Sequence, residues 1–250
     1  MLELKDVYVS FPLANNEVNE VLKGINLKVE KGDFISVLGM NGAGKSTLLN
    51  VISGALTPTK GKILLDGIDI TNMPEHKRAK MIGRLFQDPC MATASHMSIE
   101  ENLGLAYSRG KKRTLQKAIT KKDAIFFKEQ LARLQLGLED NLKQKVGLLS
   151  GGQRQALTLL MATIVTPKLL LLDEHTAALD PATATKVMQL TQQIIQENKL
   201  TTLMITHNVK QALTYGNKTI LLKDGVIEKV MDASQKAQCR VEEVLNWYSN

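Results

Sequence analysis

The sequence predicts an α/β fold built around a parallel sheet, and three patterns support this prediction. From Gly39 onward, short apolar segments alternate with helical ones, which is typical of a parallel sheet flanked by helices. Residues 1–38 instead contain three strand-like segments separated by turn residues. Residues 88–145 break the alternation with helical spacing, so we expect a mostly helical insertion in the α/β core.

Composition limits the class of protein. The chain has 250 residues, of which 44% are hydrophobic, so it can bury the core of one large domain or two small ones. Its longest wholly apolar runs are only a few residues, whereas a membrane-spanning helix needs about 20. The N-terminus alternates like a strand and lacks the apolar region of a signal peptide. We therefore expect a globular protein that stays in the cytosol.

Charge and cysteine content add two expectations. The formal net charge of +7 favours acidic neighbours, namely nucleotide phosphates, nucleic acid or anionic lipid headgroups, without choosing among them. Cys90 and Cys239 lie far apart and show no metal-ligand spacing, so both are expected to be reduced thiols. Charge and cysteine content therefore leave the class of ligand open, and sequence motifs are needed to identify it.

The strongest chemical signal is GMNGAGKST, residues 39–47, which follows the apolar strand FISVL. It matches the pattern G-x-x-x-x-G-K-[ST], in which glycines turn backbone N–H groups toward a phosphate at the start of a helix. Lys45 would reach the β and γ phosphates, and Ser46 could ligate Mg²⁺. A plain glycine-rich turn is the alternative, but the strand–loop–helix context favours nucleotide binding.

Two helices are predicted in the insertion. Ser98 and Glu101 form a capping-box pattern that opens a helix after Ser98. The helical spacing of four apolar residues marks a second buried face: Phe127, Leu131, Leu134 and Leu138.

Ser150 and Gln153 form another capping-box pattern, S-x-x-Q, ahead of a long apolar helix. Gly151 and Gly152 weaken the first turn of such a helix by about 1 kcal/mol each relative to alanine, without helping a core. That cost is understandable if a phosphate approaches closely. Two interpretations stay open and can alternate: a capped helix start, and a phosphate-binding one.

The stretch LLLLDEHTAALDP predicts a buried strand, Leu169–Leu172, that ends on two adjacent carboxylates, Asp173 and Glu174. Such a pair is expected only beside a cation. Asp180 before Pro181 is typical of a helix start, with the aspartate as N-cap.

His207 follows the strand-like segment TTLMIT, where Asn208 could cap the next helix. The carboxyl end of a core strand is where ligands bind in open α/β sheets, which favours a functional histidine over a structural one. The remaining residues predict a hairpin, TILLKDGVIEKV, and a terminal helix, VEEVLNWYS.

Together these motifs resemble the ATP-binding cassette (ABC) family over essentially the whole chain. They follow the family's order and approximate spacing: Phe11 matches the adenine-stacking aromatic, residues 39–47 the Walker A loop, Gln87 the Q-loop, Leu149–Gln153 the LSGGQ signature, Leu169–Asp173 Walker B, Glu174 the catalytic glutamate, Ala177–Asp180 the D-loop, and His207 the switch histidine. His175 and Ala177 depart from the common pattern, which has proline and serine there. We interpret them as marks of a subgroup, with His175 either titrating beside the catalytic base or only packing.

The resemblance implies an ABC ATPase fold of the P-loop NTPase class: a RecA-like parallel-sheet core, an antiparallel β subdomain and an inserted α-helical subdomain. It implies a single ABC ATP-binding domain over residues 1–250. Residues 1–87 and 166–250 would form the β subdomain and the core, and residues 88–165 the helical subdomain with the signature motif.

The resemblance also implies how ATP is bound and hydrolysed. Phe11 would stack on adenine, and Lys45 would hold the phosphates. Glu174 would polarise the attacking water, while His207 contacts the γ-phosphate. Phosphoryl transfer needs mainly positioning and charge stabilisation, so no covalent nucleophile is expected.

Cofactor and dimer contacts are implied in the same way. Mg²⁺ would be held by Ser46 and Gln87, with Asp173 acting through water. The remaining ATP contacts come from two sets, the second supplied across a head-to-tail homodimer: Gly39, Asn41, Gly42, Ala43, Gly44 and Thr47 in one, and Ser150, Gly151, Gly152, Gln153 and Asp180 in the other.

Within the family we expect a transporter ATPase. Soluble relatives in translation usually carry two cassettes, and those in DNA repair insert long coiled coils, whereas this chain has one cassette and no sustained heptads. Without a membrane span it would dock onto separate permease subunits at the cytoplasmic face of the membrane, the usual bacterial arrangement for uptake. Export, or a soluble role outside transport, is the alternative.

The docking surface is expected at residues 88–105, where Cys90, Met91 and Met97 would offer an adaptable apolar pocket, with an internally packed linker as the alternative. The basic run at residues 109–122 would be a solvated surface or lie near lipid headgroups. It has no interleaved aromatic residue, so nucleic acid is not an expected partner.

The sequences of several motifs resemble those of bacterial uptake ATPases commonly assigned to tryptophan or tyrosine, which work with a substrate-binding lipoprotein.

Overall fold

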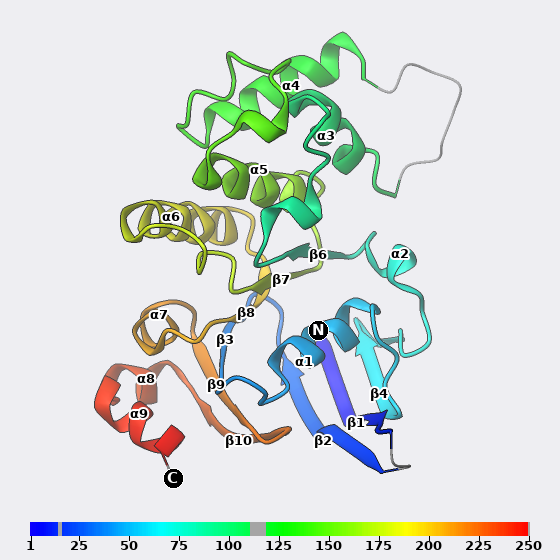
Figure 1. Cartoon of the computed structure of the whole chain (residues 1–250), viewed down its shortest axis with the longest axis vertical. Coiled ribbons are helices and arrows are strands. Elements are labelled where there is room, and N and C mark those ends of the chain that lie inside the picture. Colours follow the sequence, from blue (N-terminus) through cyan, green and yellow to red (C-terminus); the bar gives the residue numbers. More distant parts are fainter. Residues whose placement is uncertain (15–16, 111–118, 250) are drawn as a thin grey trace.

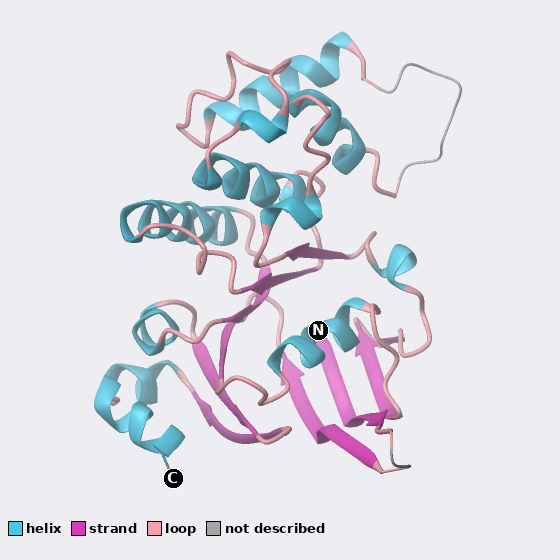
Figure 2. Cartoon of the chain, viewed as in Figure 1, coloured by secondary structure: helices cyan, strands magenta, loops and turns pink. Residues whose placement is uncertain are grey.

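The structure of the protein is a computed structural model that describes residues 1–14, 17–110 and 119–249, so most of the basic run at residues 109–122 lies outside the described residues. Two sheets lie next to each other, and a group of helices projects from the edge of the larger one (Figure 1). Strands dominate the lower half of this view and helices the upper half (Figure 2). Strands and helices are therefore unevenly distributed along the long axis of the molecule.

The smaller sheet is antiparallel, with its strands in the order β2-β1-β4-β5. The strands are β1 (Leu2–Pro12), β2 (Val18–Val29), β4 (Lys60–Leu65) and β5 (Ile68–Asp69). Strand β1 buries Leu2, Leu4, Val7 and Val9 on one face. The step from Leu4 to Val7 breaks strict alternation because Asp6 has a positive φ of 48° at a shift of register, as in a β-bulge.

The larger sheet has six strands in the order β10-β9-β3-β8-β7-β6. They are β3 (Phe34–Leu38), β6 (Ile82–Leu85), β7 (Leu169–Asp173), β8 (Thr201–Ile205), β9 (Lys218–Lys223) and β10 (Val226–Met231). Pairing is parallel from β6 to β9, and β10 returns antiparallel in the predicted hairpin. The four leucines of β7 are fully buried, as expected for a strand covered on both faces.

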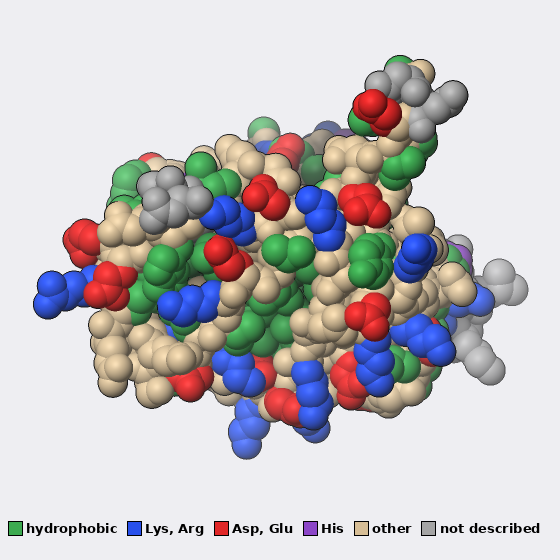
Figure 3. All heavy atoms as spheres, turned by 90° about the horizontal axis from the view of Figure 1, so that it is seen from below, with side chains coloured by type: hydrophobic (Ala, Val, Ile, Leu, Met, Phe, Trp, Pro, Cys, Tyr) green, Lys and Arg blue, Asp and Glu red, His purple; other side chains and the backbone are tan. Residues whose placement is uncertain are grey.

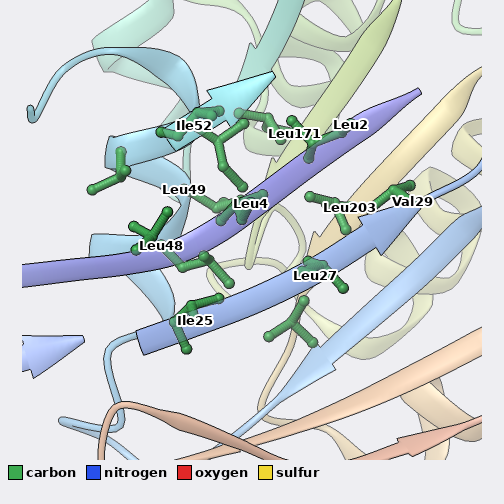
Figure 4. Packing of buried hydrophobic residues seen from close by; sticks show 14 of the residues in the cluster. Leu2, Leu4, Ile25, Leu27, Val29, Leu48, Leu49, Ile52, Leu171 and Leu203 are labelled. Carbon is green, nitrogen blue, oxygen red and sulfur yellow. The ribbon is translucent and has the colours of Figure 1, made fainter. Parts of the chain in front are cut away.

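Helix α1 (Lys45–Ser53) lies between the two sheets. Its apolar side chains pack against leucines of both sheets, so a single core joins them (Figure 4). The labelled members of this core are Leu2, Leu4, Ile25, Leu27, Val29, Leu48, Leu49, Ile52, Leu171 and Leu203. The helix that follows the P-loop is thereby fixed in position.

A buried arginine closes the carboxyl end of α1. Arg78, at the end of α2 (Glu75–Arg78), is 1% exposed and donates from Nη1 to the carbonyls of Val51 (2.7 Å) and Ile52 (2.9 Å). These are carbonyls of the last helical turn, where a cation is favoured by the helix dipole. Gly54 makes room for the guanidinium, since a Cβ there would lie 2.8 Å from Nε of Arg78.

The projecting helices are α3 (Ile99–Tyr107), α4 (Lys121–Ala132) and α5 (Gly151–Thr163). The predicted capping box of Ser98 and Glu101 opens α3. The prediction of one helical face from Phe127 to Leu138 is wrong in its extent. Helix α4 ends at Ala132, and Leu138 is buried from the irregular segment that follows, after a residue of positive φ at Gln135.

The remaining helices lie on the side of the larger sheet opposite α1 (Figure 1): α6 (Pro181–Glu197), α7 (Val209–Thr214), α8 (Ala233–Gln238) and the predicted terminal helix α9 (Val241–Ser249). Among the described residues, the 3₁₀ turn η1 (Pro89–Ala92) precedes α3, and the 3₁₀ turn η2 (Val146–Leu148) precedes α5. No helix in the described part of the chain has the length and apolar character that crossing a bilayer requires. On the face opposite the projecting helices, basic and acidic side chains are interspersed (Figure 3).

Candidate active site

The parallel strands bring four functional segments to one edge of the sheet. The P-loop follows β3, Gln87 follows β6, Asp173 ends β7, and His207 follows β8. All four strands run in the same direction, so their carboxyl ends share an edge. This is the edge at which open α/β sheets bind ligands.

The P-loop has the backbone that a phosphate cradle requires. Gly42 and Gly44 have φ values of 85° and 98°, a left-handed region that side chains disfavour. Gly39 passes so close to β9 that a Cβ would lie 2.4 Å from the carbonyl oxygen of Leu222. The predicted phosphate-binding residues all belong to this loop and the first turn of α1: Gly39, Asn41, Gly42, Ala43, Gly44, Lys45, Ser46 and Thr47.

Lys45 folds back over the loop. Its Nζ donates to the carbonyl oxygens of Gly39 (2.8 Å) and Met40 (3.0 Å). Burial lowers the pKa of Lys45, while the nearby charges of Glu174 and Asp173 raise it. A phosphate entering the loop would offer this ammonium a charged acceptor, which forms stronger hydrogen bonds than neutral carbonyls do.

Glu174 and His207 are in direct contact. Nδ1 of His207 lies 3.0 Å from Oε2 of Glu174, and these side chains are 61% and 17% exposed. A carboxylate only accepts hydrogen bonds, so the imidazole donates from Nδ1. The sequence predicted both residues, and the structure brings them together from two neighbouring strands.

Local hydrogen bonds fix the segment that carries His207. Asn208 caps α7, as predicted, by accepting from the backbone N–H of Gln211 at 3.0 Å. Its own N–H donates to the hydroxyl of Thr206 at 3.0 Å. His207 therefore lies between Thr206 and Asn208, and the hydrogen bonds at the start of α7 fix the positions of both residues.

The signature helix starts as a capped helix in this structure. Ser150 accepts from the N–H of Gln153 at 3.3 Å, and the Gln153 side chain accepts from the N–H of Ser150 at 3.1 Å. We expected Gly151 and Gly152 only to let a phosphate approach the helix start, without contributing to packing. This is wrong for Gly152, because a Cβ there would lie 2.3 Å from Cγ2 of Thr183. Close packing of α5 on α6 therefore also requires a glycine.

Asp180 is the N-cap of α6, as predicted. Its Oδ1 accepts from the N–H of Thr183 at 3.1 Å, and Pro181 occupies the first helical position.

A family model described as "ABC transporter" matches residues 22–177 of this sequence. The chain belongs to the ABC transporter family. A "Tyrosine transport ATP-binding protein" of Clostridioides difficile (strain R20291) is 44% identical over 98% of this cassette and 97% of its own length. The "Thiamine import ATP-binding protein ThiQ" of Escherichia coli (strain K12) is 38% identical over 81% of the cassette and 82% of its own length.

Solved structures agree with this assignment. The ATP-binding cassette MJ0796, in a structure described as a dimeric, post-hydrolysis state bound to ADP and Pi, matches 93% of this cassette and 99% of its own chain with a TM-score of 0.79 at 30% identity. The cassette MJ1267 in its ADP conformation has a TM-score of 0.81 at 24% identity over all of this chain and 99% of its own, which supports the fold. The chain is therefore the ATP-binding subunit of an ABC transporter, and it is an ATPase.

The donor set of the cassette fits magnesium bound together with nucleotide. Ser46, Gln87 and Asp173 offer a hydroxyl, an amide and a carboxylate, which are hard oxygen ligands. Among the described residues, no cluster of three or more histidine, cysteine, aspartate or glutamate side chains could hold a metal alone. Mg²⁺ suits this arrangement because it is usually held by one or two carboxylates together with substrate phosphates.

The structure adds a cation that sequence reasoning missed. Nη2 of Arg84, on β6, lies 3.3 Å from Oδ2 of Asp173, and Nη1 donates to the hydroxyl of Ser53 at 3.2 Å. The guanidinium also lies over the ring of Phe86, with Cζ 4.5 Å from its centroid. Burial raises the pKa of Asp173, and Arg84 opposes that rise. An arginine inside the apolar strand segment IGRLF was the available signal.

His175 resolves one of the alternatives left by the sequence. It is 2% exposed, and its Nε2 lies 3.1 Å from the hydroxyl of Thr191. Burial lowers its pKa to about 4, so it is neutral at physiological pH. His175 therefore packs inside the cassette and does not titrate beside Glu174 at neutral pH.

Two predicted sites lie outside the strand ends that carry the P-loop, whereas Gln87 lies at that edge, exposed just after β6. Phe11 is 39% exposed near the end of β1 in the smaller sheet. The signature helix α5 lies on the far side of β6 and β7 from α1 (Figure 1). At the expected docking segment, Met91 is 70% exposed and Cys90 accepts a hydrogen bond from Arg154, so an exposed turn stands where we predicted an apolar pocket.

Proposed function

We propose that this cassette is the ATP-hydrolysing subunit of a bacterial uptake transporter, with Glu174 as the base that polarises the attacking water. The contact of Glu174 with His207 at 3.0 Å, at the sheet edge that also carries the P-loop, is the observation that carries this proposal. A carboxylate held by a donor beside a phosphate cradle is suited to orient water for in-line attack.

The other residues hold and orient the nucleotide. Lys45 exchanges the loop carbonyls that it contacts in this structure for phosphate oxygens. Ser46, Gln87 and Asp173 would hold Mg²⁺, which neutralises charge on the phosphate oxygens when it is bound. His207 keeps Glu174 in place and contacts the γ-phosphate.

Completion of the site requires a second copy of the chain. Ser150–Gln153 form the start of α5, and this helix lies on the far side of β6 and β7 from α1, the helix that follows the P-loop (Figure 1), which supports a head-to-tail homodimer. In that dimer Ser150 would give up its capping bond with Gln153 for a phosphate oxygen of the partner's ATP, while Asp180 lines the interface. Phe11, 39% exposed, is accessible to an adenine ring.

The transporter context follows from the relatives. We propose that residues 1–87 and 166–250 form the nucleotide-binding part and residues 88–165 the helical part, whose segment at residues 88–105 docks onto permease subunits at the cytoplasmic face of the membrane. Relatives named for tyrosine transport and thiamine import support uptake. The 44% identity to the tyrosine transport protein over nearly the whole chain favours an aromatic amino acid as the cargo. We propose that a substrate-binding lipoprotein delivers it, as the motif resemblance implies.

Glu174→Gln tests the catalytic proposal. The variant should bind ATP with unchanged affinity, hydrolyse it about 10²–10⁴-fold more slowly and accumulate as a dimer with ATP. Steady-state ATPase assays, equilibrium ATP binding and size-exclusion chromatography measure the three effects. Near-normal hydrolysis by Glu174→Gln would contradict the role of Glu174.

The transport proposal needs a separate measurement. Deleting the gene should abolish uptake of radiolabelled tyrosine or tryptophan by cells, and the wild-type gene should restore it while Glu174→Gln should not. Unchanged uptake of both amino acids, with loss of thiamine uptake, would identify a different cargo. Accumulation of a substrate inside the deletion strain would favour the alternative, an exporter.

A further inference from the structure

His175 is a buried polar side chain that the proposed mechanism does not use. It follows Glu174 directly, and its ring is enclosed between the end of β7 and helix α6. Thr191, its hydrogen-bond partner on α6, is fully buried. The pair joins the segment after the Walker B strand to the middle of a long helix.

The direction of the hydrogen bonds is fixed by chemistry. The hydroxyl of Thr191 has one hydrogen, which it donates to the carbonyl of Val187 at 2.8 Å. The same oxygen is therefore the acceptor for His175, and Nε2 of the imidazole is the donor at 3.1 Å. One tautomer and one orientation of the ring satisfy this chain of two bonds.

The residue between this anchor and the strand has an uncommon backbone conformation. Glu174 has a φ of 44°, a left-handed conformation that residues with a side chain seldom adopt. Such a conformation persists only where the surroundings determine it. On one side, the N–H of Glu174 donates to the carbonyl of Ile205 on β8 at 3.2 Å. On the other side, the carbonyl of Glu174 accepts from the N–H of Ala177 at 2.9 Å, and the chain continues into His175.

We propose that His175 is a positioning residue for the catalytic step: its hydrogen bond to Thr191 holds Glu174 in the left-handed conformation that places its carboxylate against His207. The inference rests on the proposed role of Glu174 as the base. Without the anchor, Glu174 relaxes toward an ordinary backbone conformation and its carboxylate moves away from the attacking water. The P-loop follows a different strand, so nucleotide binding is not affected.

Four single variants of the full-length chain test the anchor. Thr191→Val is isosteric and removes the acceptor, and His175→Leu removes the donor; each should lower kcat by about 10- to 100-fold with the ATP dissociation constant and KM unchanged. Thr191→Ser keeps the hydroxyl, and His175→Gln presents an amide N–H near the position of Nε2. Both should retain most of the wild-type kcat.

Matched controls separate positioning from a general loss of stability. Thr163, on α5, is also buried and donates its hydroxyl to a carbonyl four residues earlier, that of Leu159 at 2.8 Å. Thr163→Val should therefore lose a similar internal bond and keep its kcat. The double variant His175→Leu/Thr191→Val should be no slower than the slower single variant, because both changes remove one interaction.

The outcomes are distinguishable. Wild-type kcat in Thr191→Val, or an equal fall of kcat in Thr191→Val and Thr163→Val, would overturn the positioning role. Failure of Thr191→Ser to retain activity would do so as well, because that variant keeps the acceptor. If Glu174→Gln hydrolyses ATP normally, the proposed base is wrong; if Glu174→Gln is inactive while Thr191→Val is normal, only the role of His175 fails.

Discussion

Acid should destabilise this cassette through His175, because the folded protein keeps this side chain neutral. Burial lowers the pKa of His175 from its ordinary value of 6.5 to about 4. Below pH 6.5 the unfolded chain binds a proton that the folded chain does not bind, so the free energy of unfolding falls as the pH falls from 6.5 to about 4. One pKa unit corresponds to about 1.4 kcal/mol, so the full loss is about 3 kcal/mol, of which about 2 kcal/mol is reached at pH 5.

Urea unfolding at a series of pH values measures this effect when the wild type is compared with His175→Gln, which stays neutral throughout. Asp173 contributes with the opposite sign, because burial raises its pKa and the folded state then binds a proton more readily on acidification. That contribution is present in both proteins and cancels in the difference. The wild type should lose about 2 kcal/mol relative to His175→Gln between about pH 8 and about pH 5. A difference independent of pH would refute the neutral, buried histidine.

Three further substitutions probe other contacts. Lys45→Ala should weaken ATP binding by about tenfold or more, since it removes a charge-assisted contact to phosphate, and unchanged affinity in equilibrium binding would contradict the P-loop assignment. Arg84→Met should lower the free energy of unfolding by about 1–3 kcal/mol, because it leaves the carboxylate of Asp173 without its partner; Arg84→Lys should lose less, and equal losses in chemical denaturation would argue against charge pairing. Gly152→Ala should lower the melting temperature, and adding Thr183→Ser, which removes the clashing methyl group, should restore most of it in calorimetry; no restoration would show that another contact is responsible.

Much of the fold could be predicted because its signals are local. The strand Leu169–Leu172 is recognisable from a continuous apolar run. The helix starts at Ser98, Ser150 and Asp180 follow from capping patterns that span only four residues. The Walker A loop is equally local, because the glycine positions and the following helix are adjacent in sequence.

The contacts around the paired acids could not be predicted in this way. Arg84 and Asp173 are 89 positions apart, and His175 and Thr191 are 16 apart, so neither pairing leaves a short pattern in the sequence. The closeness of Gly152 to Thr183 likewise depends on how two helices pack. The end of α4 was misjudged because apolar spacing continues past Ala132, where the backbone leaves the helix.

The adjacency of β6 and β7 has a mechanical consequence. The chain leaves the larger sheet after β6 and returns to it at β7, and these strands are hydrogen-bonded neighbours from Ile82 and Leu169 onward. The projecting helices are thus tethered to the rest of the molecule at one edge, through two connections that lie next to each other. A rotation of these helices about that edge would bend two short connections and leave every strand pairing intact. It would have to slide α5 over α6 and β6, because side chains of all three elements share one buried cluster.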